Sequence, residues 1–480
     1  MGNTNTIDLK NVDQIMKKAI CAAGIFSQLN QEHTDRIVRA VYEAGFNNRI
    51  KLAKLAHEET GLGNWKDKVI KNVVATQLVY EDLKNLKTVG TISEDPERGI
   101  TEIAQPIGPI FALIPTTNPT STVMFKILIA LKSRNPIIIG PPSKATKCCN
   151  EAARICYEAA LSQDAPEDCI QWLKATSREQ THALMSHKKL ALVLATGGSS
   201  LVGAAYSSGT PAIGVGPGNV PVFIEQSADP EFAVDQILIS KTFDNGTICA
   251  SEQAIVVEQP LADKVKDILK KRKAYFLSEE EIEKLQAIAF DPQRGIMNSA
   301  IVGQPAEKIA KMAKINAPSD VVLLIAPLKG IGKEYPLSCE ILAPILAFYV
   351  ADNFDHAVNV CIDLNFHGGI GHTASLFSNN EDKIKEFSSV MNAGRIVVNM
   401  PSSQGAVGGL YDTLHPSFTL GCGSGGKNIT TDNITATHLL NIQRIARRRV
   451  NNRLEHFDKS LYFDESLDTE TIEAEFNRNY

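Results

Sequence analysis

Apolar residues near the start of the chain recur every three or four positions. The segments Asp13–Ala23 and Glu32–Phe46 place them on one side of a helix, among charged residues on the other sides. This spacing is typical of amphipathic helices. We therefore predict that residues 8–98 are helical.

After about residue 100 the apolar residues gather in short runs. Amphipathic segments such as Thr146–Leu161 and Asp229–Thr242 separate these runs. Short apolar runs alternating with helices predict buried strands in βαβ units and parallel sheets. The pattern occurs twice, before and after about residue 242, so we expect two parallel-sheet α/β domains. The runs are Ile107–Ile114, Pro136–Ile139, Leu190–Leu194, Val220–Ile224, Ala254–Val257, Val321–Ile325, Leu346–Val350 and Arg395–Val398.

Composition excludes several functional classes. The chain has 480 residues, and 54 acidic against 49 basic residues give a net charge of -5. This balance and the aromatic content of 6% argue against a nucleic-acid partner. No apolar run reaches the roughly 18–20 residues that span a bilayer, and the polar start lacks the apolar core of a signal peptide. We expect a cytoplasmic protein with no membrane partner.

The nine cysteines indicate reduced thiols. Their number is odd and they form no C-x-x-C pair, which favours a reducing compartment and gives no metal site. The sequence therefore leaves a catalytic cysteine as a hypothesis to examine, and it gives no indication of a zinc site. The cysteines are Cys21, Cys148, Cys149, Cys156, Cys169, Cys249, Cys339, Cys361 and Cys422.

Three glycine clusters are candidates for a phosphate site. Residues 195–203 (ATGGSSLVG) follow an apolar run and precede a helical pattern, the context in which backbone amides bind phosphate. An ordinary βα turn explains the same residues equally well. Residues 421–428 (GCGSGGKN) resemble a P-loop, but Asn428 replaces the Ser or Thr that holds magnesium, and a loop is favoured. Residues 214–219 precede a strand and predict a tight turn.

Cys249 differs from the other cysteines in its surroundings. It follows the polar turn of residues 243–248 (FDNGTI) and precedes the run Ala254–Val257. A thiol at such a turn can face a cleft and gain thiolate character from nearby amides. On spacing alone a structural cysteine is the better explanation. The sequence around the other eight cysteines gives no sign of a catalytic role, so we interpret them as packing thiols.

Four motifs, in chain order, resemble those of the aldehyde dehydrogenase superfamily. Residues 115–119 (PTTNP) are similar to its P-W-N-F-P segment, and residues 198–203 (GSSLVG) to its pyrophosphate turn G-S-T-x-x-G. Residues 246–249 (GTIC) resemble its catalytic-cysteine signature, and residues 340–344 (EILAP) its E-I-F-G-P segment. The resemblance extends over roughly residues 10–450.

The resemblance implies an aldehyde dehydrogenase-like fold and a set of site residues. It assigns Cys249 as the nucleophile and Asn118 as a donor to the oxyanion, together with the backbone N–H of Cys249. It implies a nicotinamide cofactor, NAD, with NADP left open, and no catalytic metal. The cofactor-binding residues that it implies are Ile114, Pro115, Thr116, Thr117, Gly198, Ser199, Gly203, Gly216, Glu340 and Leu420.

Other stretches resemble the CoA-acylating branch of this superfamily. Residues 204–209, 243–253 and 368–373 look like the aldehyde half of bifunctional aldehyde–alcohol dehydrogenases, and like stand-alone acetaldehyde and sulfoacetaldehyde dehydrogenases. Residues 459–463 resemble the linker that begins the alcohol half, and the iron-dependent alcohol half itself is not expected in this chain. His372, within residues 368–373, could assist the thiol of coenzyme A, although a structural histidine is an equal interpretation.

Two departures from the hydrolytic relatives sharpen the expected reaction. Gly214 stands where those enzymes have the glutamate base, so coenzyme A rather than water is expected to accept the acyl group. We expect Gly214→Glu to raise oxidation that does not need coenzyme A. Pro141 replaces a ribose-binding lysine, which leaves the choice between NAD and NADP open.

The expected reaction is the reversible oxidation of a short aldehyde to its acyl-CoA through a thioester on Cys249. Acetaldehyde is the first expectation and sulfoacetaldehyde the alternative. A phosphorylating or reductive relative, and a non-catalytic NAD-binding relative, remain as further readings of the same motifs.

The expected domain organisation has four parts. An NAD-binding domain covers residues 1–242 and a catalytic domain 243–425. A small β element at 426–450, which strands near 100–106 can join, is expected to pair subunits into a homo-oligomer. An acidic tail at 451–480 is expected to be a solvated or docking extension.

Overall fold

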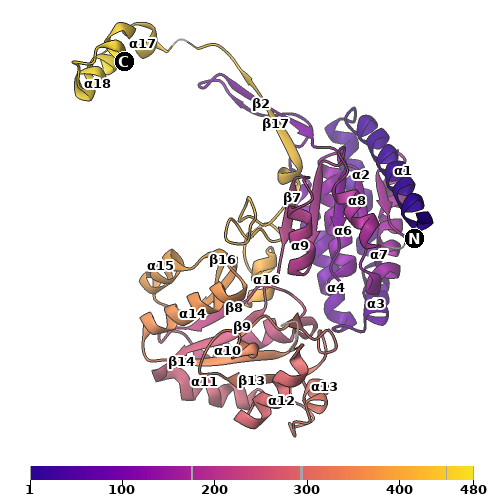
Figure 1. Ribbon diagram of the computed structural model, residues 1–480, viewed down its shortest axis with the longest axis vertical. Helices are drawn as coiled ribbons and strands as arrows, with labels where there is room; N and C mark the ends of the chain where they lie inside the picture. Colours follow the sequence, from indigo (N-terminus) through magenta and orange to yellow (C-terminus); the bar gives the residue numbers. More distant parts are fainter. Residues whose placement is uncertain (1, 175–176, 292–295, 450, 479–480) are drawn as a thin grey trace. The chain divides into compact units, whose positions relative to one another are not determined.

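A computed structural model of the chain describes residues 2–174, 177–291, 296–449 and 451–478 (Figure 1). Positions 1, 450 and 480, which bound expected domains, lie outside the described residues. The chain forms two compact units, described separately here. The first contains the chain up to Leu86 together with Pro106–Leu440, and the second contains Lys87–Gln105 and Asn441–Tyr480.

The first unit begins with helices, as the spacing of apolar residues predicts. Asn30 and Asn64 cap two of them by accepting from the backbone N–H three residues on, and Gly61 ends another with φ of 67°. The predicted helical range is wrong at its end, because residues 90–95 form a strand. The helices are α1 (Gly2–Phe26), α2 (Gln31–Asn47), α3 (Arg49–Thr60), α4 (Trp65–Val73), the π-helical turn η1 (Val74–Leu78) and α5 (Val79–Leu83).

A five-stranded parallel sheet follows, with strand order β5-β4-β3-β6-β7. Alternate residues of β3 enter different cores: Ile110 and Ala112 pack with α6 and α7, whereas Phe111 and Leu113 pack with α1, α8 and α9. Both faces are therefore covered, which explains why the strands are uniformly apolar. The strands are β3 (Ile110–Leu113), β4 (Ile137–Gly140), β5 (Ile170–Trp172), β6 (Leu192–Thr196) and β7 (Ala212–Val215). The helical elements are α6 (Pro119–Lys132), η2 (Ser143–Ala145), α7 (Thr146–Leu161), α8 (Arg178–Met185) and α9 (Ser199–Tyr206).

The second sheet has seven strands in the order β10-β13-β14-β9-β8-β15-β16, and its described pairings are parallel. Ile255 and Val257 of β9 pack with α10 and α11, and Ala254 and Val256 pack with α14 and α15. The strands are β8 (Val220–Ile224), β9 (Glu252–Glu258), β10 (Ala274–Phe276), β13 (Leu323–Pro327), β14 (Ile345–Ala351), β15 (Gly371–Phe377) and β16 (Ala393–Val398). The helical elements are α10 (Pro230–Thr242), η3 (Phe243–Gly246), α11 (Gln259–Lys271), α12 (Glu279–Ala289), α13 (Ala306–Met312), η4 (Pro336–Ser338), α14 (Phe354–Gly368), α15 (Glu381–Val390), α16 (Ser402–Val407) and η5 (Ala436–Leu439). The short strands β11 (Phe290–Asp291) and β12 (Ile296–Met297) pair separately.

Two parallel-sheet α/β layers confirm the predicted fold class, but the change of sheet does not occur at residue 242. Strand β8 pairs with β9 and β15 of the seven-stranded sheet. The chain therefore passes from one sheet to the other between Val215 and Val220. The apolar runs alone do not reveal which strands pair, because all of them have the same buried character.

The second unit is a three-stranded sheet followed by short helices. Its strand order is β1-β2-β17, and β1 pairs with β2 in antiparallel register. In the tail, the Phe457 ring lies 4.6 Å from that of Tyr462 and 5.7 Å from that of Phe476, so the acidic tail has a small aromatic cluster. The elements are β1 (Gly90–Asp95), β2 (Ile100–Pro106), β17 (Leu440–Ala446), α17 (Asn452–Glu455), η6 (Lys459–Phe463) and α18 (Thr469–Asn477).

Candidate active site

Residues 243–249, the cysteine turn, place Cys249 just before β9. Asp244, Asn245 and Gly246 have φ values of 48°, 54° and 71°. Asp and Asn tolerate this left-handed region better than most side chains, and glycine adopts it freely. A Cβ on Gly246 would lie 2.9 Å from the Ala343 carbonyl oxygen, so the turn has no room for a side chain there. Cys249 itself is half-buried.

Two buried lysines of α4 contact this turn. Lys68 Nζ donates to Asp244 Oδ2 at 2.9 Å, and Lys71 Nζ donates to the same oxygen and to Thr247 Oγ1 at 2.8 Å. Their side chains are 3% and 2% exposed and that of Asp244 is 0% exposed. Burial alone would raise the pKa of Asp244. The two ammonium groups outweigh this effect, so the pKa of Asp244 lies below its ordinary value. Burial lowers the pKa of Lys71 to about 8, against the opposing charge of Asp244.

Asn118, the predicted oxyanion donor, stands at the N-terminus of α6. Its Oδ1 accepts a hydrogen bond from Lys71 Nζ at 2.6 Å, and its Nδ2 donates to Thr117 Oγ1 at 3.2 Å. Lys71 therefore connects Asn118 to the cysteine turn, although the three segments are distant in the sequence. Asn118 and Cys249 stand in motifs that the sequence reveals, whereas Lys71 stands in none.

Glu340 lies against the Gly218 backbone close to Cys249. The Gly218 N–H donates to Glu340 Oε1 at 3.0 Å. A Cβ on Gly218 would lie 2.6 Å from the Cys249 carbonyl oxygen and 2.9 Å from Cγ of His372. Burial raises the pKa of Glu340 to about 7, with Lys241 acting in the opposite direction. The structure thus brings Glu340 and Cys249 together, as the motif order implies.

The surroundings of Cys249 disfavour its thiolate form. Burial raises its pKa to about 12, and the charge of Glu340 adds to this effect. Cys422 also raises the pKa of Cys249, whereas Arg395 lowers it. Cys422 is buried in a hydrophobic core, which fits its interpretation as a packing thiol, and it comes near Cys249 through a loop that is distant in sequence.

His372 is a neutral imidazole beside this group. Burial and the charge of Arg395 lower its pKa to about 3. Its Nδ1 contacts Thr373 Oγ1 at 2.9 Å, and its Nε2 has no partner among the described residues. A pKa lowered this far opposes protonation of the ring, which favours the structural interpretation of His372 over a role in proton transfer.

A cavity of about 1010 Å³ opens at the carboxyl ends of β3 and β4, beside α8 and α9. In doubly wound sheets, ligands bind outside the carboxyl ends of the strands. Of the predicted cofactor residues, Ile114 lines the cavity. Its other lining residues are Leu113, Gly140, Pro141, Pro142, Ser143, Ser177, Arg178, Glu179, Gln180, Thr181, His182, Ala183, Met185, Ser200, Leu201 and Ala204.

The predicted phosphate turn lies next to this cavity. Gly198 is the N-cap of α9, whose first turn has no acidic residue and no side-chain cap. Gly198, Ser199 and Gly203 are exposed, and a Cβ on either glycine would meet open space. Uncapped helix amides beside a cavity of this size fit the pyrophosphate of a dinucleotide.

The remaining predicted cofactor residues occupy connecting segments. Pro115, Thr116 and Thr117 are partly exposed in the link from β3 to α6, and Gly216 in the link from β7 to β8. Leu420 is buried and bridges to Asn433. None of these five lines the cavity beside α9.

The glycine cluster at 421–428 forms a turn, as predicted, and not a phosphate loop. Gly423 N–H donates to Thr430 O at 2.9 Å, and Asn428 N–H donates to Gly423 O at 2.7 Å. Arg395 Nη2 donates to the Gly421 carbonyl oxygen. The glycines allow backbones to approach closely, since a Cβ on Gly421 would lie 2.5 Å from Thr430 O.

Gly214 does not offer the space for a general base. A Cβ there would lie 2.7 Å from Val202 Cγ1 and 2.9 Å from the Tyr206 hydroxyl. That hydroxyl already donates to Gly214 O at 3.0 Å. A glutamate at 214 would therefore require Val202 and Tyr206 to move, which opposes the gain of hydrolysis that the sequence predicts for Gly214→Glu.

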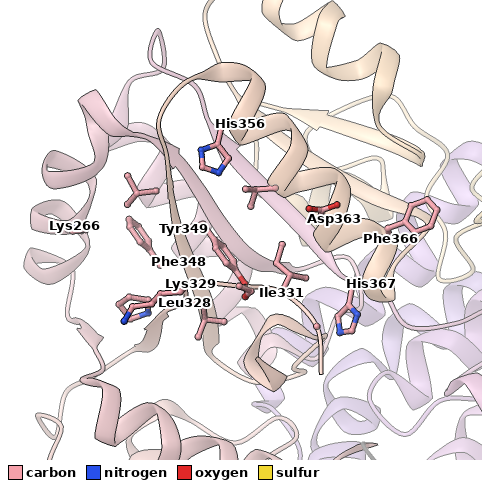
Figure 2. A pocket seen from close by; sticks show the side chains of 15 residues that line it. Lys266, Leu328, Lys329, Ile331, Phe348, Tyr349, His356, Asp363, Phe366 and His367 are labelled. Carbon is pink, nitrogen blue, oxygen red and sulfur yellow. The ribbon is translucent and has the colours of Figure 1, made fainter. Parts of the chain in front are cut away.

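A second cavity, of about 980 Å³, lies along α14 and includes none of the predicted site residues. Figure 2 shows side chains of α14, β14 and residues 327–332 around it, with His356 and His367 toward different ends. Cys339 Sγ lies 3.3 Å from Nε2 of His367. Within the described ranges, no group of three His, Cys, Asp or Glu residues could hold a metal ion. A search of the same residues finds no helix long and apolar enough to cross a bilayer.

Residues 1–293 match the sequence model of the aldehyde dehydrogenase family. The chain belongs to this family. It is 46% identical over 447 residues to an aldehyde-alcohol dehydrogenase of Clostridium acetobutylicum, a match that covers 92% of this chain and 51% of the relative. This aldehyde dehydrogenase family member thus spans about half the length of the first curated relatives that it matches.

Solved structures of the family match over nearly their whole length. An acetylating aldehyde dehydrogenase from Geobacillus thermoglucosidasius is 45% identical with a TM-score of 0.91, covering 94% of this chain and 99% of that one. A Rhodopseudomonas palustris propionaldehyde dehydrogenase, with bound CoA and an acylated cysteine, is 26% identical with a TM-score of 0.81, covering 91% of this chain and 97% of that one.

Proposed function

We propose that this aldehyde dehydrogenase oxidises a short aldehyde, acetaldehyde first, to its acyl-CoA, with NAD as hydride acceptor. The observation that carries the proposal is the grouping of Cys249, Asn118 and Glu340 around one turn. The same chain has a cavity suited to a dinucleotide at the carboxyl ends of β3 and β4. The acetylating relative and the CoA-bound, acylated-cysteine relative support the choice of coenzyme A as acyl acceptor.

The first step is addition of the Cys249 sulfur to the aldehyde carbon. The thiol proton must leave, because the pKa of Cys249 is raised to about 12. His372 is too weak a base to hold this proton, because its pKa is lowered to about 3. Cys249 is only half-buried, so the proton leaves to solvent water. The carbonyl oxygen becomes an oxyanion, held by the Cys249 N–H and Asn118 Nδ2, where one donor typically contributes about 3 kcal/mol.

The second step removes hydride from the carbon bound to sulfur and leaves an acyl-thioester on Cys249. When bound, NAD supplies the hydride acceptor. Ile114 and the amides at the start of α9 would hold its adenosine and pyrophosphate part, and Glu340 its nicotinamide ribose. The coenzyme A thiolate then attacks the thioester carbonyl, and the Cys249 thiolate leaves.

The lack of a glutamate base at Gly214 supports transfer to coenzyme A over hydrolysis. Water attack on a thioester is slow without a positioned base, which typically contributes about 10²–10⁴-fold.

The proposal assigns a function to each sheet region: the five-stranded sheet region binds the cofactor and the seven-stranded sheet region carries the nucleophile. We also propose a homo-oligomer paired through the sheet of β1, β2 and β17, and the cytoplasm as the compartment, since all nine cysteines are free thiols.

Replacement of the nucleophile tests the proposal. Cys249→Ala is expected to abolish NADH formation from acetaldehyde and coenzyme A, because no thiohemiacetal can form. Cys21→Ala, which removes an exposed thiol of α1, is the matched control and is expected to keep full turnover. NADH formation by the Cys249→Ala protein at the wild-type rate would refute the covalent mechanism.

The acceptor and the aldehyde are tested by substitution of substrates. Wild-type protein is assayed with acetaldehyde or sulfoacetaldehyde, with NAD or NADP, and with coenzyme A, phosphate or water as acceptor. Turnover that requires coenzyme A supports acyl transfer, whereas equal turnover with phosphate contradicts it. The ratio of kcat/KM values for the two aldehydes decides the substrate.

A further inference from the structure

The Lys71 ammonium contacts both parts of the proposed oxyanion site. It donates to Asn118 Oδ1 at 2.6 Å and to Thr247 Oγ1 at 2.8 Å, two residues before Cys249. It also pairs with Asp244, whose side chain is fully buried. One cation therefore connects the Asn118 carboxamide with the turn whose Cys249 N–H is the other oxyanion donor.

The chemistry of the ammonium group decides the orientation of the carboxamide. An ammonium group has three donors and no acceptor, so it can face the oxygen of Asn118 but not the nitrogen. The Nδ2 group must then lie on the other side of the carboxamide, where it can donate to a developing oxyanion. Without the cation, the amide could rotate and present an oxygen, which would repel that charge.

We propose that Lys71 is a positioning residue for aldehyde oxidation, which it serves by fixing Asn118 with Nδ2 as the donor and by tying it to the cysteine turn. This inference rests on the proposed function. Lys68 provides a comparison, because it is equally buried and pairs with the same Asp244 oxygen. Its other described contact is with the Thr117 carbonyl oxygen at 3.3 Å, so it reaches the backbone beside Asn118 but not the Asn118 carboxamide or Thr247.

The test compares Lys71→Met with Lys68→Met. Each variant keeps one lysine on Asp244, so both lose a similar amount of buried charge, and thermal unfolding measures their loss of stability. Removing an oxyanion donor lowers kcat by about 10²–10³-fold, and we expect Lys71→Met to lower kcat by about 10–100-fold with little change in the KM for aldehyde. Lys68→Met is expected to lower kcat by less than about threefold.

A double-mutant cycle separates positioning from general damage. If Lys71 acts through Asn118, then Lys71→Met in an Asn118→Ala background should lower kcat by less than about twofold further. Alkylation of Cys249 by iodoacetamide forms no oxyanion, so its rate should be the same in the Lys71→Met and wild-type proteins. A structural role would instead give additive losses and a changed alkylation rate.

The outcomes are distinguishable. An active wild type with an equally active Lys71→Met variant, or additive losses in the cycle, overturns this inference alone. A wild type without any aldehyde oxidation contradicts the proposed function, and the inference fails with it. Loss of kcat confined to Lys71→Met, absent in the Asn118→Ala background, supports both.

Discussion

Buried cations in this protein are compensated in two different ways. Lys71 shares a carboxylate with Lys68, whereas Lys126 in the middle of α6 donates only to two carbonyl oxygens, those of Leu113 at 2.8 Å and Leu194 at 2.9 Å. Carbonyl groups do not neutralise charge, and burial lowers the pKa of Lys126 to about 7. Lys126 thus binds the last carbonyl group of β3 and one in the middle of β6, and its burial carries an electrostatic cost that depends on pH.

We predict that Lys126→Met removes part of the pH dependence of stability. Between about pH 7 and the ordinary lysine pKa, the unfolded chain binds a proton at Lys126 that the folded chain does not. Stability from this group therefore rises with pH in that window, by up to about 1.4 kcal/mol per pH unit. The melting temperature of the wild type relative to Lys126→Met should be higher at pH 9 than at pH 7. A difference that stays constant with pH would show that Lys126 does not titrate there.

At the residue scale, the sequence identifies functional residues that stand in recognisable short motifs. Cys249 and Asn118 stand in short motifs, so their roles could be predicted from neighbouring residues. Lys71 could not be selected in this way, because its partner is distant: Lys71 and Asp244 are 173 positions apart. A lysine on an amphipathic helix usually faces solvent, and only the fold shows that this one is buried.

At the scale of elements, the link between β7 and β8 packs closely against the cysteine turn. Gly218 in this link lies between the Cys249 carbonyl and the His372 ring, and its N–H holds Glu340. The sequence predicted a tight turn at 214–219 and a strand after it, both from local pattern. It could not predict that the turn changes sheets, because β8 pairs with strands that come later in the chain.

We predict that Gly218→Ala lowers kcat by about tenfold or more. The added methyl group would lie 2.6 Å from the Cys249 carbonyl oxygen, so the cysteine turn or His372 must move. Misplacement of reacting groups by about 1 Å can reduce rates about 10²-fold. Gly24→Ala, where a Cβ meets open space in α1, is the control for glycine replacement and should keep full turnover. Equal turnover of the two variants would show that the cysteine turn accommodates the added methyl group without loss of activity.

At the scale of the whole molecule, the chain contributes an unpartnered strand edge. In the order β1-β2-β17, β17 is an outer strand, and Ile445 on it is 43% exposed. Exposed strand edges tend to pair with another chain, which supports the proposed homo-oligomer. The sequence predicted a pairing element at 426–450, and the strand within it begins at residue 440.

Ile445→Asp is predicted to reduce the molecular mass in solution. A charge on this edge opposes pairing with a second chain, while the catalytic unit is expected to fold as before. Light scattering would measure the mass, and circular dichroism would report whether the fold is retained. An unchanged mass would exclude the β17 edge as the pairing surface.

The long separation between Lys71 and Asp244 has a consequence for protein synthesis. On the ribosome, α4 emerges well before the cysteine turn, and N-terminal regions generally fold first. Until Asp244 and the rest of the cysteine turn are made, Lys71 and Asn118 lack the turn that carries the Cys249 N–H donor. The nascent chain therefore has no complete oxyanion site. Cys249 can react with an aldehyde only after the second sheet begins to assemble.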